Sequence, residues 1–173
     1  MIIRSLLVDL LSEYSSLLSC CSLAWREKSL RTRCFRLIFN RLIPELSVSN
    51  FERSLSFYTD VLLFAIEYQR PEHLFAFLNF QGSQLMIEQQ NGYWETGTLE
   101  YPCGRGINFS IQVDSLDDVV ESLNRNNHPI RIGPKVNAYR KGDRILRHRE
   151  LLVLDPDGYL LRFTQHFGLD EAE

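Results

Sequence analysis

Apolar and polar residues alternate along residues 42–48, which is the pattern of a β-strand with one buried face. Leu46 and Val48 belong to one face of this segment, and Glu45 and Ser47 belong to the other. A side chain on the polar face points away from the core, so this strand predicts both a buried layer and a polar surface beside it.

A helix is expected directly after this strand. Ser49 and Glu52 have the spacing of a capping box, in which each side chain accepts a hydrogen bond from the other residue's amide. The apolar residues that follow recur at helical spacing: Phe51, Leu55, Tyr58 and Leu62. Three strand-like runs come next, with Pro71 and Gly82 as breaks between them: residues 64–69, 74–80 and 84–89.

The same order of elements repeats about 65 residues later. Residues 107–113 alternate, Asp114 occupies the cap position, and a second apolar stripe follows: Leu116, Val119, Val120 and Leu123. Strands are expected from residues 130–132 onward, at 150–154 and at 159–164. The sequence DPDG at residues 155–158 is a tight-turn signal between the last two strands.

The repeat predicts an α+β fold of two βαβββ modules, residues 42–90 and 106–166. Each module alone would leave one sheet face uncovered. We therefore expect the modules to form a cup-shaped, partly open mixed β-sheet barrel with flanking helices, within one chain or across a dimer. An unrelated α+β domain with accidental symmetry is the alternative.

Composition narrows the class of protein. A chain of 173 residues, 45% hydrophobic and 24% charged, has the makeup of one globular domain. The net charge of -3 argues against a nucleic-acid partner, and the absence of a long apolar stretch argues against a membrane partner. The four cysteines form no CxxC pair, which favours a reducing cytoplasm over a disulfide framework.

Residues 1–40 differ from the rest, because they are rich in Leu, Ser, Arg and Cys and contain no Gly or Pro. The segment ending at Cys20 has a faint likeness to a lipoprotein cleavage site, but Asp9 and Glu13 interrupt the apolar region that such a signal needs. We expect a helical or poorly ordered extension, or sequence from a start codon assigned too far upstream. The functional domain is placed at residues 41–168, followed by a C-terminal tail at 169–173.

Three segments, residues 42–62, 101–118 and 151–163, resemble the vicinal-oxygen-chelate superfamily, which includes glyoxalase I, extradiol dioxygenases, fosfomycin-resistance enzymes and bleomycin-resistance proteins. The last two segments are most similar to the bleomycin-resistance branch, including the GRGINF sequence at residues 104–109.

Enzymes of this superfamily hold a divalent metal at four strand positions, two in each module. Matching the motifs places those positions here on Ile43, Glu88, Asn108 and Arg162. Only Glu88 is a good ligand, because isoleucine has no donor atom and arginine is permanently cationic. We therefore expect no metal, no cofactor and no catalytic residue, and we hypothesise that a Glu88–Arg162 pair replaces the cation.

The four histidines have no ligand spacing along one helix or strand, and each is expected at the surface or in a turn. They are His73, His128, His148 and His166.

The polar face of the cup is the predicted ligand site. The loop of residues 91–105 is aromatic and acidic, and it suits a lid over a planar or cationic ligand. The alternative is that its Trp94 and Tyr101 only pack the junction of the modules. The candidate ligand-binding residues are Glu45, Glu88, Trp94, Tyr101, Asn108, Ser110, Tyr139 and Arg162.

The resemblance implies a cytoplasmic homodimer that binds and sequesters a small molecule, such as a glycopeptide antibiotic of the bleomycin type, without catalysis. One alternative is a superfamily enzyme, a lyase or an oxygenase, acting on an unknown small substrate. A metal-free enzyme with Glu45 or Glu88 as its base is another. A domain with an unrelated ligand is a third.

Overall fold

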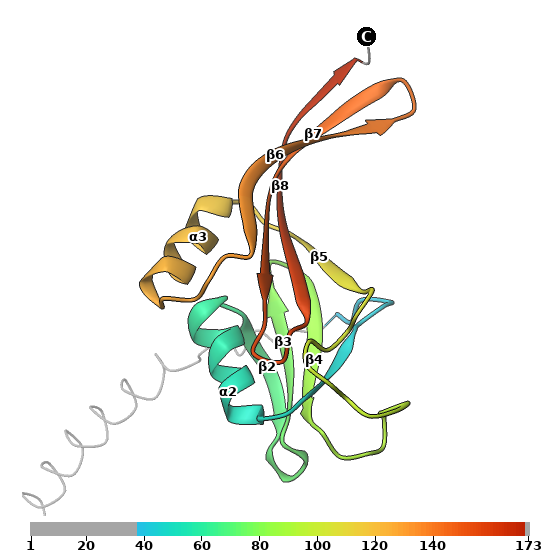
Figure 1. Cartoon of the computed structure of the whole chain (residues 1–173), viewed down its shortest axis with the longest axis vertical. Coiled ribbons are helices and arrows are strands. Elements are labelled where there is room, and N and C mark those ends of the chain that lie inside the picture. The colour runs from blue at the N-terminus through green and yellow to red at the C-terminus, as the bar shows by residue number, and fades with distance from the viewer. Residues whose placement is uncertain (1–37, 172–173) are drawn as a thin grey trace, which may run out of the picture. The chain divides into compact units, whose positions relative to one another are not determined.

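The computed structural model describes residues 38–171, which form two modules, each with a four-stranded mixed sheet and a helix (Figure 1). Residues 1–37 of the predicted N-terminal extension lie outside the described residues. No helix in the described part of the chain is long and apolar enough to cross a membrane.

The first module has strand order β1-β4-β3-β2, with β1 parallel to β4 and the other neighbours antiparallel. A helix, α2, continues into a single π-helical turn, η1, after β1. A short 3₁₀ turn, η2, joins β2 to β3. The elements are β1 (Glu45–Val48), α2 (Phe51–Ser56), η1 (Phe57–Val61), β2 (Ala65–Arg70), η2 (Pro71–His73), β3 (Phe75–Phe80) and β4 (Ser83–Gln89).

The second module repeats this arrangement, with strand order β5-β8-β7-β6. Its parallel pair is β5 with β8, which corresponds to β1 with β4 in the first module. The elements are β5 (Asn108–Gln112), α3 (Leu116–Arg125), β6 (Ile132–Lys141), β7 (Arg144–Leu154) and β8 (Leu160–Glu171). The predicted α+β fold of two βαβββ modules is confirmed, although the two sheets are not closed into a barrel.

The core lies between the helices and one face of each sheet, and both helices lie on the same side of the sheets in Figure 1. Tyr58 and Leu62 from the first helical segment and Leu116 and Leu123 from α3 are almost fully buried. Each sheet therefore has one face covered by helix and a second face available for a site.

Both helix caps differ from the sequence prediction by one residue. Asn50, not Ser49, caps α2 by accepting from the amide of Arg53 at 2.9 Å. Ser115, not Asp114, caps α3 through the amide of Asp118. Ser49 does not act as the cap because its hydroxyl donates to Asp157 of the second module.

Strands β6 and β7 form a hairpin in which β6 begins within the run predicted from residues 130–132 onward, whereas β7 is much longer than the strand predicted at 150–154. The segment 144–149 carries three arginines and a histidine without clear apolar alternation, so its strand character was missed. β8 likewise continues past residue 164 to Glu171, into the segment assigned to the C-terminal tail.

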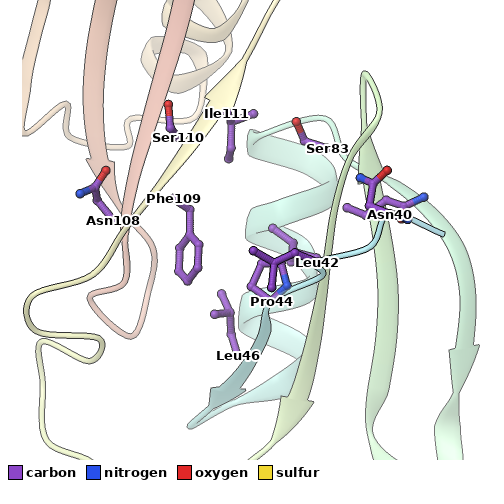
Figure 2. A pocket seen from close by; sticks show the side chains of 11 residues that line it. Asn40, Leu42, Pro44, Leu46, Ser83, Asn108, Phe109, Ser110 and Ile111 are labelled. Carbon is purple, nitrogen blue, oxygen red and sulfur yellow. The ribbon is translucent and has the colours of Figure 1, made fainter.

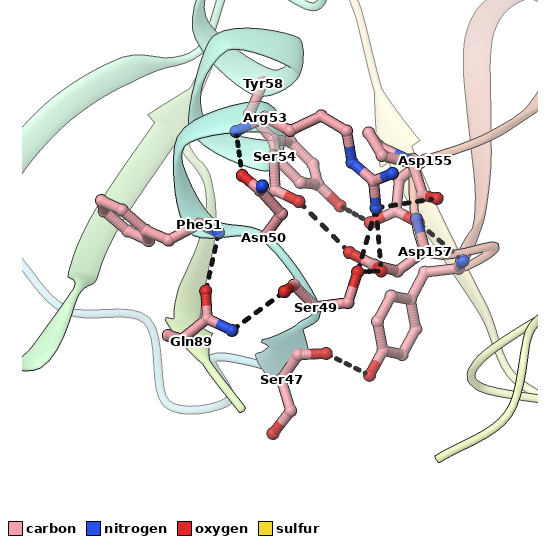
Figure 3. A network of polar contacts seen from close by, with 12 residues as sticks. Ser47, Ser49, Asn50, Phe51, Arg53, Ser54, Tyr58, Gln89, Asp155 and Asp157 are labelled. Carbon is pink, nitrogen blue, oxygen red and sulfur yellow. Dashed lines mark hydrogen bonds and ion pairs between the residues drawn. The ribbon is translucent and has the colours of Figure 1, made fainter. Parts of the chain in front are cut away.

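Two aspartates in the turn between β7 and β8 join the modules (Figure 3). Asp155 accepts from the Tyr58 hydroxyl at 3.0 Å and from the amides of Asp157 and Tyr159. Asp157 accepts from the hydroxyls of Ser49 and Ser54, and it forms an ion pair with Arg53. The helix of the first module is therefore held on the final turn of the second.

We predict that the substitution Asp155→Asn changes how stability depends on pH. Burial raises the pKa of Asp155 from 3.8 to about 6, even though the two backbone amides and the Tyr58 hydroxyl favour its charged form. A carboxyl whose pKa is higher in the folded state stabilises the fold at low pH, and this contribution is lost as pH rises through about 6.

Asparagine keeps the size and does not ionise. The unfolding free energy of the wild type should therefore fall relative to Asp155→Asn by about 3 kcal/mol between about pH 4 and about pH 7. Urea unfolding across this range measures the difference, with the exposed Asp143→Asn as control. If the unfolding free energy of the wild type stayed constant or rose with pH relative to that of Asp155→Asn, the assignment would be contradicted.

Candidate functional site

Side chains on the open faces of the two sheets line two cavities of similar size. In the first module, Glu45 and Ser47 alternate with the buried Leu46 and Val48, so the carboxylate lies on the face away from the helices. The first-module cavity has a volume of about 440 Å³ and is lined by Glu45, Arg70, His73, Glu88, Asn91, Tyr93 and Trp94.

Two carboxyl groups lie together in the first-module cavity because β1 and β4 are parallel neighbours. The pKa of Glu45 is raised, first by burial and then by the charge of Glu88 and a hydrogen bond with it, while Arg70 opposes the shift. Trp94 Nε1 donates to Glu88 Oε2 at 3.1 Å, which fixes the indole beside the pair. Two neighbouring carboxylates repel each other, and either a bound cation or a proton shared between them relieves the repulsion.

Aromatic rings also lie at and beside the first-module cavity. Phe75 pairs with Glu88 across β3 and β4, and the guanidinium of Arg70 lies 3.7 Å from the centre of the Phe75 ring. Tyr93 and Trp94 pack edge to face at 4.6 Å, with Trp94 57% exposed. The site therefore offers two carboxyls and the Arg70 guanidinium next to an exposed aromatic surface.

The second-module cavity has a volume of about 420 Å³. Glu150 is nearly fully buried here and accepts from the Asn137 amide at 2.6 Å and the Tyr139 hydroxyl at 3.0 Å. The pKa of Tyr139 is raised by burial and by Glu150. The lining residues are Ser110, Gln112, Tyr139, Leu146, His148, Glu150, Arg162, Thr164 and His166.

A third cavity lies between β1 and β5 and is mainly apolar (Figure 2). Its volume is about 420 Å³. On one side it is lined by Leu42, Pro44 and Leu46 of the first module, and on the other by Phe109 and Ile111 of the second. Asn108 and Ser110 also line this cavity, and Ser110 is shared with the second-module cavity.

The predicted ligand-binding residues are thus divided among cavities. The structure brings Glu45, Glu88 and Trp94 together in one cavity, and Ser110, Tyr139 and Arg162 together in another.

Tyr101 lines none of these three cavities and is 66% exposed. Its ring lies close to Gly158, where an added Cβ would approach a ring carbon to 3.0 Å. The Tyr101 ring therefore lies beside the turn between β7 and β8.

The hypothesis of a Glu88–Arg162 pair is wrong in this structure. The two side chains line different cavities, and the partner of Glu88 is the Trp94 indole. No ion pair joins the two among residues 38–171.

The residues at the superfamily's metal positions do not fit a divalent cation. Arg162 places a permanent positive charge in the second-module cavity, and Ile43 has no donor atom. Within the described part of the chain, no group of three or more His, Cys, Asp or Glu side chains is arranged to hold a metal.

His148 and His166 were not expected to lie together. Their ring centres are 3.9 Å apart, because the two residues pair across β7 and β8. Both are nine residues from Asp157, and residues equidistant from a hairpin turn face each other. The turn at residues 155–158 was therefore a signal that could have found this pair. Four further cavity residues were also missed: Arg70, His73, Tyr93 and Glu150.

Comparison with known proteins identifies relatives. The family model described as "Glyoxalase/Bleomycin resistance protein/Dioxygenase superfamily" matches residues 39–163. No curated protein matches the chain. A solved member of that superfamily from Vibrio splendidus 12B01 is 30% identical and covers 71% of this chain and 96% of its own, with a TM-score of 0.31.

Two further solved structures are similar in fold. A virulence protein from Salmonella typhimurium is 22% identical, covering 76% of this chain and 100% of its own, with a TM-score of 0.54. A glyoxalase/bleomycin resistance protein/dioxygenase from Alicyclobacillus acidocaldarius is 20% identical, covering 75% and 93%, with a TM-score of 0.52. At these identities the likeness concerns the fold alone.

We predict that the substitution Glu88→Gln lowers the pKa of Glu45. Glutamine removes the neighbouring charge and leaves the burial in place, so the pKa should move toward its usual value without reaching it. NMR titration of the Glu45 carboxyl carbon measures this shift, and Glu72→Gln in the exposed η2 turn is the control. An unchanged Glu45 pKa in Glu88→Gln would show that the two carboxyls do not interact.

Proposed function

The chain belongs to the glyoxalase/bleomycin resistance protein/dioxygenase superfamily, and we propose that it binds and sequesters a cationic small molecule of the glycopeptide-antibiotic type without transforming it. The ligand's positive charge would lie in the first-module cavity, and a flat aromatic part would stack on the exposed ring of Trp94. Bleomycin, which is cationic and carries a planar tail, is the representative ligand.

The observation that carries this proposal is the pair of carboxyls, Glu45 and Glu88, with Trp94 hydrogen-bonded to one of them. A cation placed between the carboxyls would remove their mutual repulsion and favour the ionised form of both. Cations also bind favourably to the face of an indole ring. Charge and aromatic surface therefore favour the same class of ligand.

Sequestration requires binding without a reactive group. The superfamily's metal positions carry Arg162 and Ile43, which supports a protein that holds its ligand rather than one that polarises it through a metal.

The proposal includes a cytoplasmic homodimer. β1 and β5 are edge strands, and open edges are commonly covered by a partner. Leu42 and Ile107, which flank these edges, are 85% and 57% exposed, and burying them in a second copy would be favourable. A cytoplasmic location agrees with the free thiol of Cys103.

A second candidate function is a metal-free enzyme in which Glu45 acts as a general base. The raised pKa of Glu45 supports it, because a base works best when its pKa approaches the working pH. The two functions differ in the fate of the ligand, which an enzyme changes and a sequestering protein returns intact.

We predict saturable binding of bleomycin to the full chain at micromolar affinity or tighter, roughly -8 kcal/mol or better. Calorimetry measures the heat of binding, and Trp fluorescence reports a change in the surroundings of the Trp94 indole. Sedimentation of the same sample gives the oligomeric state. Trp94→Phe should abolish the fluorescence change, and Glu45→Gln and Glu88→Gln should each weaken binding about tenfold through loss of one charge.

Tyr101→Phe is the control for Trp94→Phe, and Glu72→Gln is the control for the two charge variants. Absence of binding by folded protein would reject the proposal. Recovery of chemically altered bleomycin would instead favour the enzyme.

A further inference from the structure

The second-module cavity contains buried hydrogen-bonding atoms without partners. Among the buried side-chain nitrogen and oxygen atoms of residues 38–171, three have none: both ring nitrogens of His148 and Nε of Arg162. Both residues line this cavity. Buried polar atoms are almost always paired, so a cluster of unpaired ones indicates a site shaped for something that supplies the partner.

The neighbouring acceptor is already engaged. Glu150 accepts hydrogen bonds from Asn137 and Tyr139, and it forms no ion pair with Arg162 among the described residues. The guanidinium therefore brings a positive charge into the cavity that no carboxylate of the described residues neutralises at contact distance.

The surroundings of His148 favour an added negative charge. The ionisable groups that face it are Tyr139 from β6, Glu150 from β7, and Arg162 and His166 from β8. Burial lowers the pKa of His148, His166 and Arg162 lower it further, and Glu150 opposes them. An anion beside these groups would offset the effects of both burial and positive charge.

We propose that the second-module cavity binds an oxyanion, a carboxylate, phosphate or phosphonate group of a small molecule, with Arg162 and His148 as its hydrogen-bond donors. A guanidinium presents several N–H donors in one plane, which matches the oxygens of such a group. The hydroxyl of Ser110 and the amide of Gln112 line the same cavity and add polar contacts at its wall. This site is separate from the Glu45–Glu88 cavity and does not depend on the function proposed there.

Other occupants fit less well. Of the described residues that line this cavity, Glu150 is the only one with a carboxyl and is already bonded to Asn137 and Tyr139, so a metal ion or an organic cation would meet the charge of Arg162 without a free carboxylate to bind. Water can accept the hydrogen bonds but cannot balance the charge. Arg162 occupies a position that motif matching assigns to a metal ligand in the superfamily's enzymes. In the second-module cavity the protein's own guanidinium therefore supplies the positive charge.

The test is an NMR titration of the imidazole groups of the full chain with inorganic phosphate, methylphosphonate and acetate in separate arms, each at matched ionic strength with sodium chloride. At least one anion should shift the His148 and His166 signals saturably and raise the pKa of His148. The arm that binds at the lowest concentration identifies the class of oxyanion.

Arg162→Gln should weaken the anion's binding about tenfold or more, because it removes the charged donor. Arg140→Gln should bind as the wild type does, since Arg140 is exposed on β6 and bonds to the Gly142 carbonyl. If Arg162→Gln does not fold, His148→Asn serves in its place and should weaken binding measured on His166. Titrations that shift no imidazole signal beyond the chloride control, or equal binding by wild type and the folded cavity variant, would overturn the proposal.

Discussion

The buried carboxyl groups of the turn between β7 and β8 join the two modules of the fold. Asp155 and Asp157 accept hydrogen bonds from Tyr58, Ser54 and Ser49, which lie in or next to the helix of the first module. The same aspartates also accept from the turn's own amides or bind Arg53. Burying these charged groups is costly, so their dense network of donors holds the two modules in one arrangement.

This joint leaves one face of each sheet open, and the two open faces carry different sets of charged groups, with Arg70 beside the carboxyls of the first and Glu150 beside the guanidinium of the second. The first-module cavity combines two carboxyls with an indole, whereas the second contains an unpaired guanidinium and two imidazoles. Both cavities derive from strand alternation, because one face of each sheet packs under the helices and polar side chains on the other face line the cavities. The proposals that the cavities bind charged ligands rest on these groups.

Most of the fold could be predicted from the sequence, because alternation and helical spacing are local signals that the core depends on. Each helix cap lies one residue later than predicted. For α2 the reason is that Ser49 bonds to Asp157, a partner 108 residues away. The full length of the β6–β7 hairpin was missed, because residues 144–149 show no clear alternation of apolar and polar side chains. Within the site, the meeting of Glu45, Glu88 and Trp94 followed from strand and loop positions. The division into separate cavities depends on how the modules pack, which no local pattern contains.

We propose that charged side chains of the chain itself, and not a metal held at the superfamily's positions, make the binding sites. Metal content per chain tests it directly, measured by elemental analysis after the full-length protein and Glu88→Gln are dialysed against Zn²⁺, Ni²⁺ or Mn²⁺ and then against metal-free buffer. We expect far less than one metal per chain in both proteins, because Arg162 and Ile43 provide no ligand. About one metal per chain in the wild type, lost in Glu88→Gln, would contradict it.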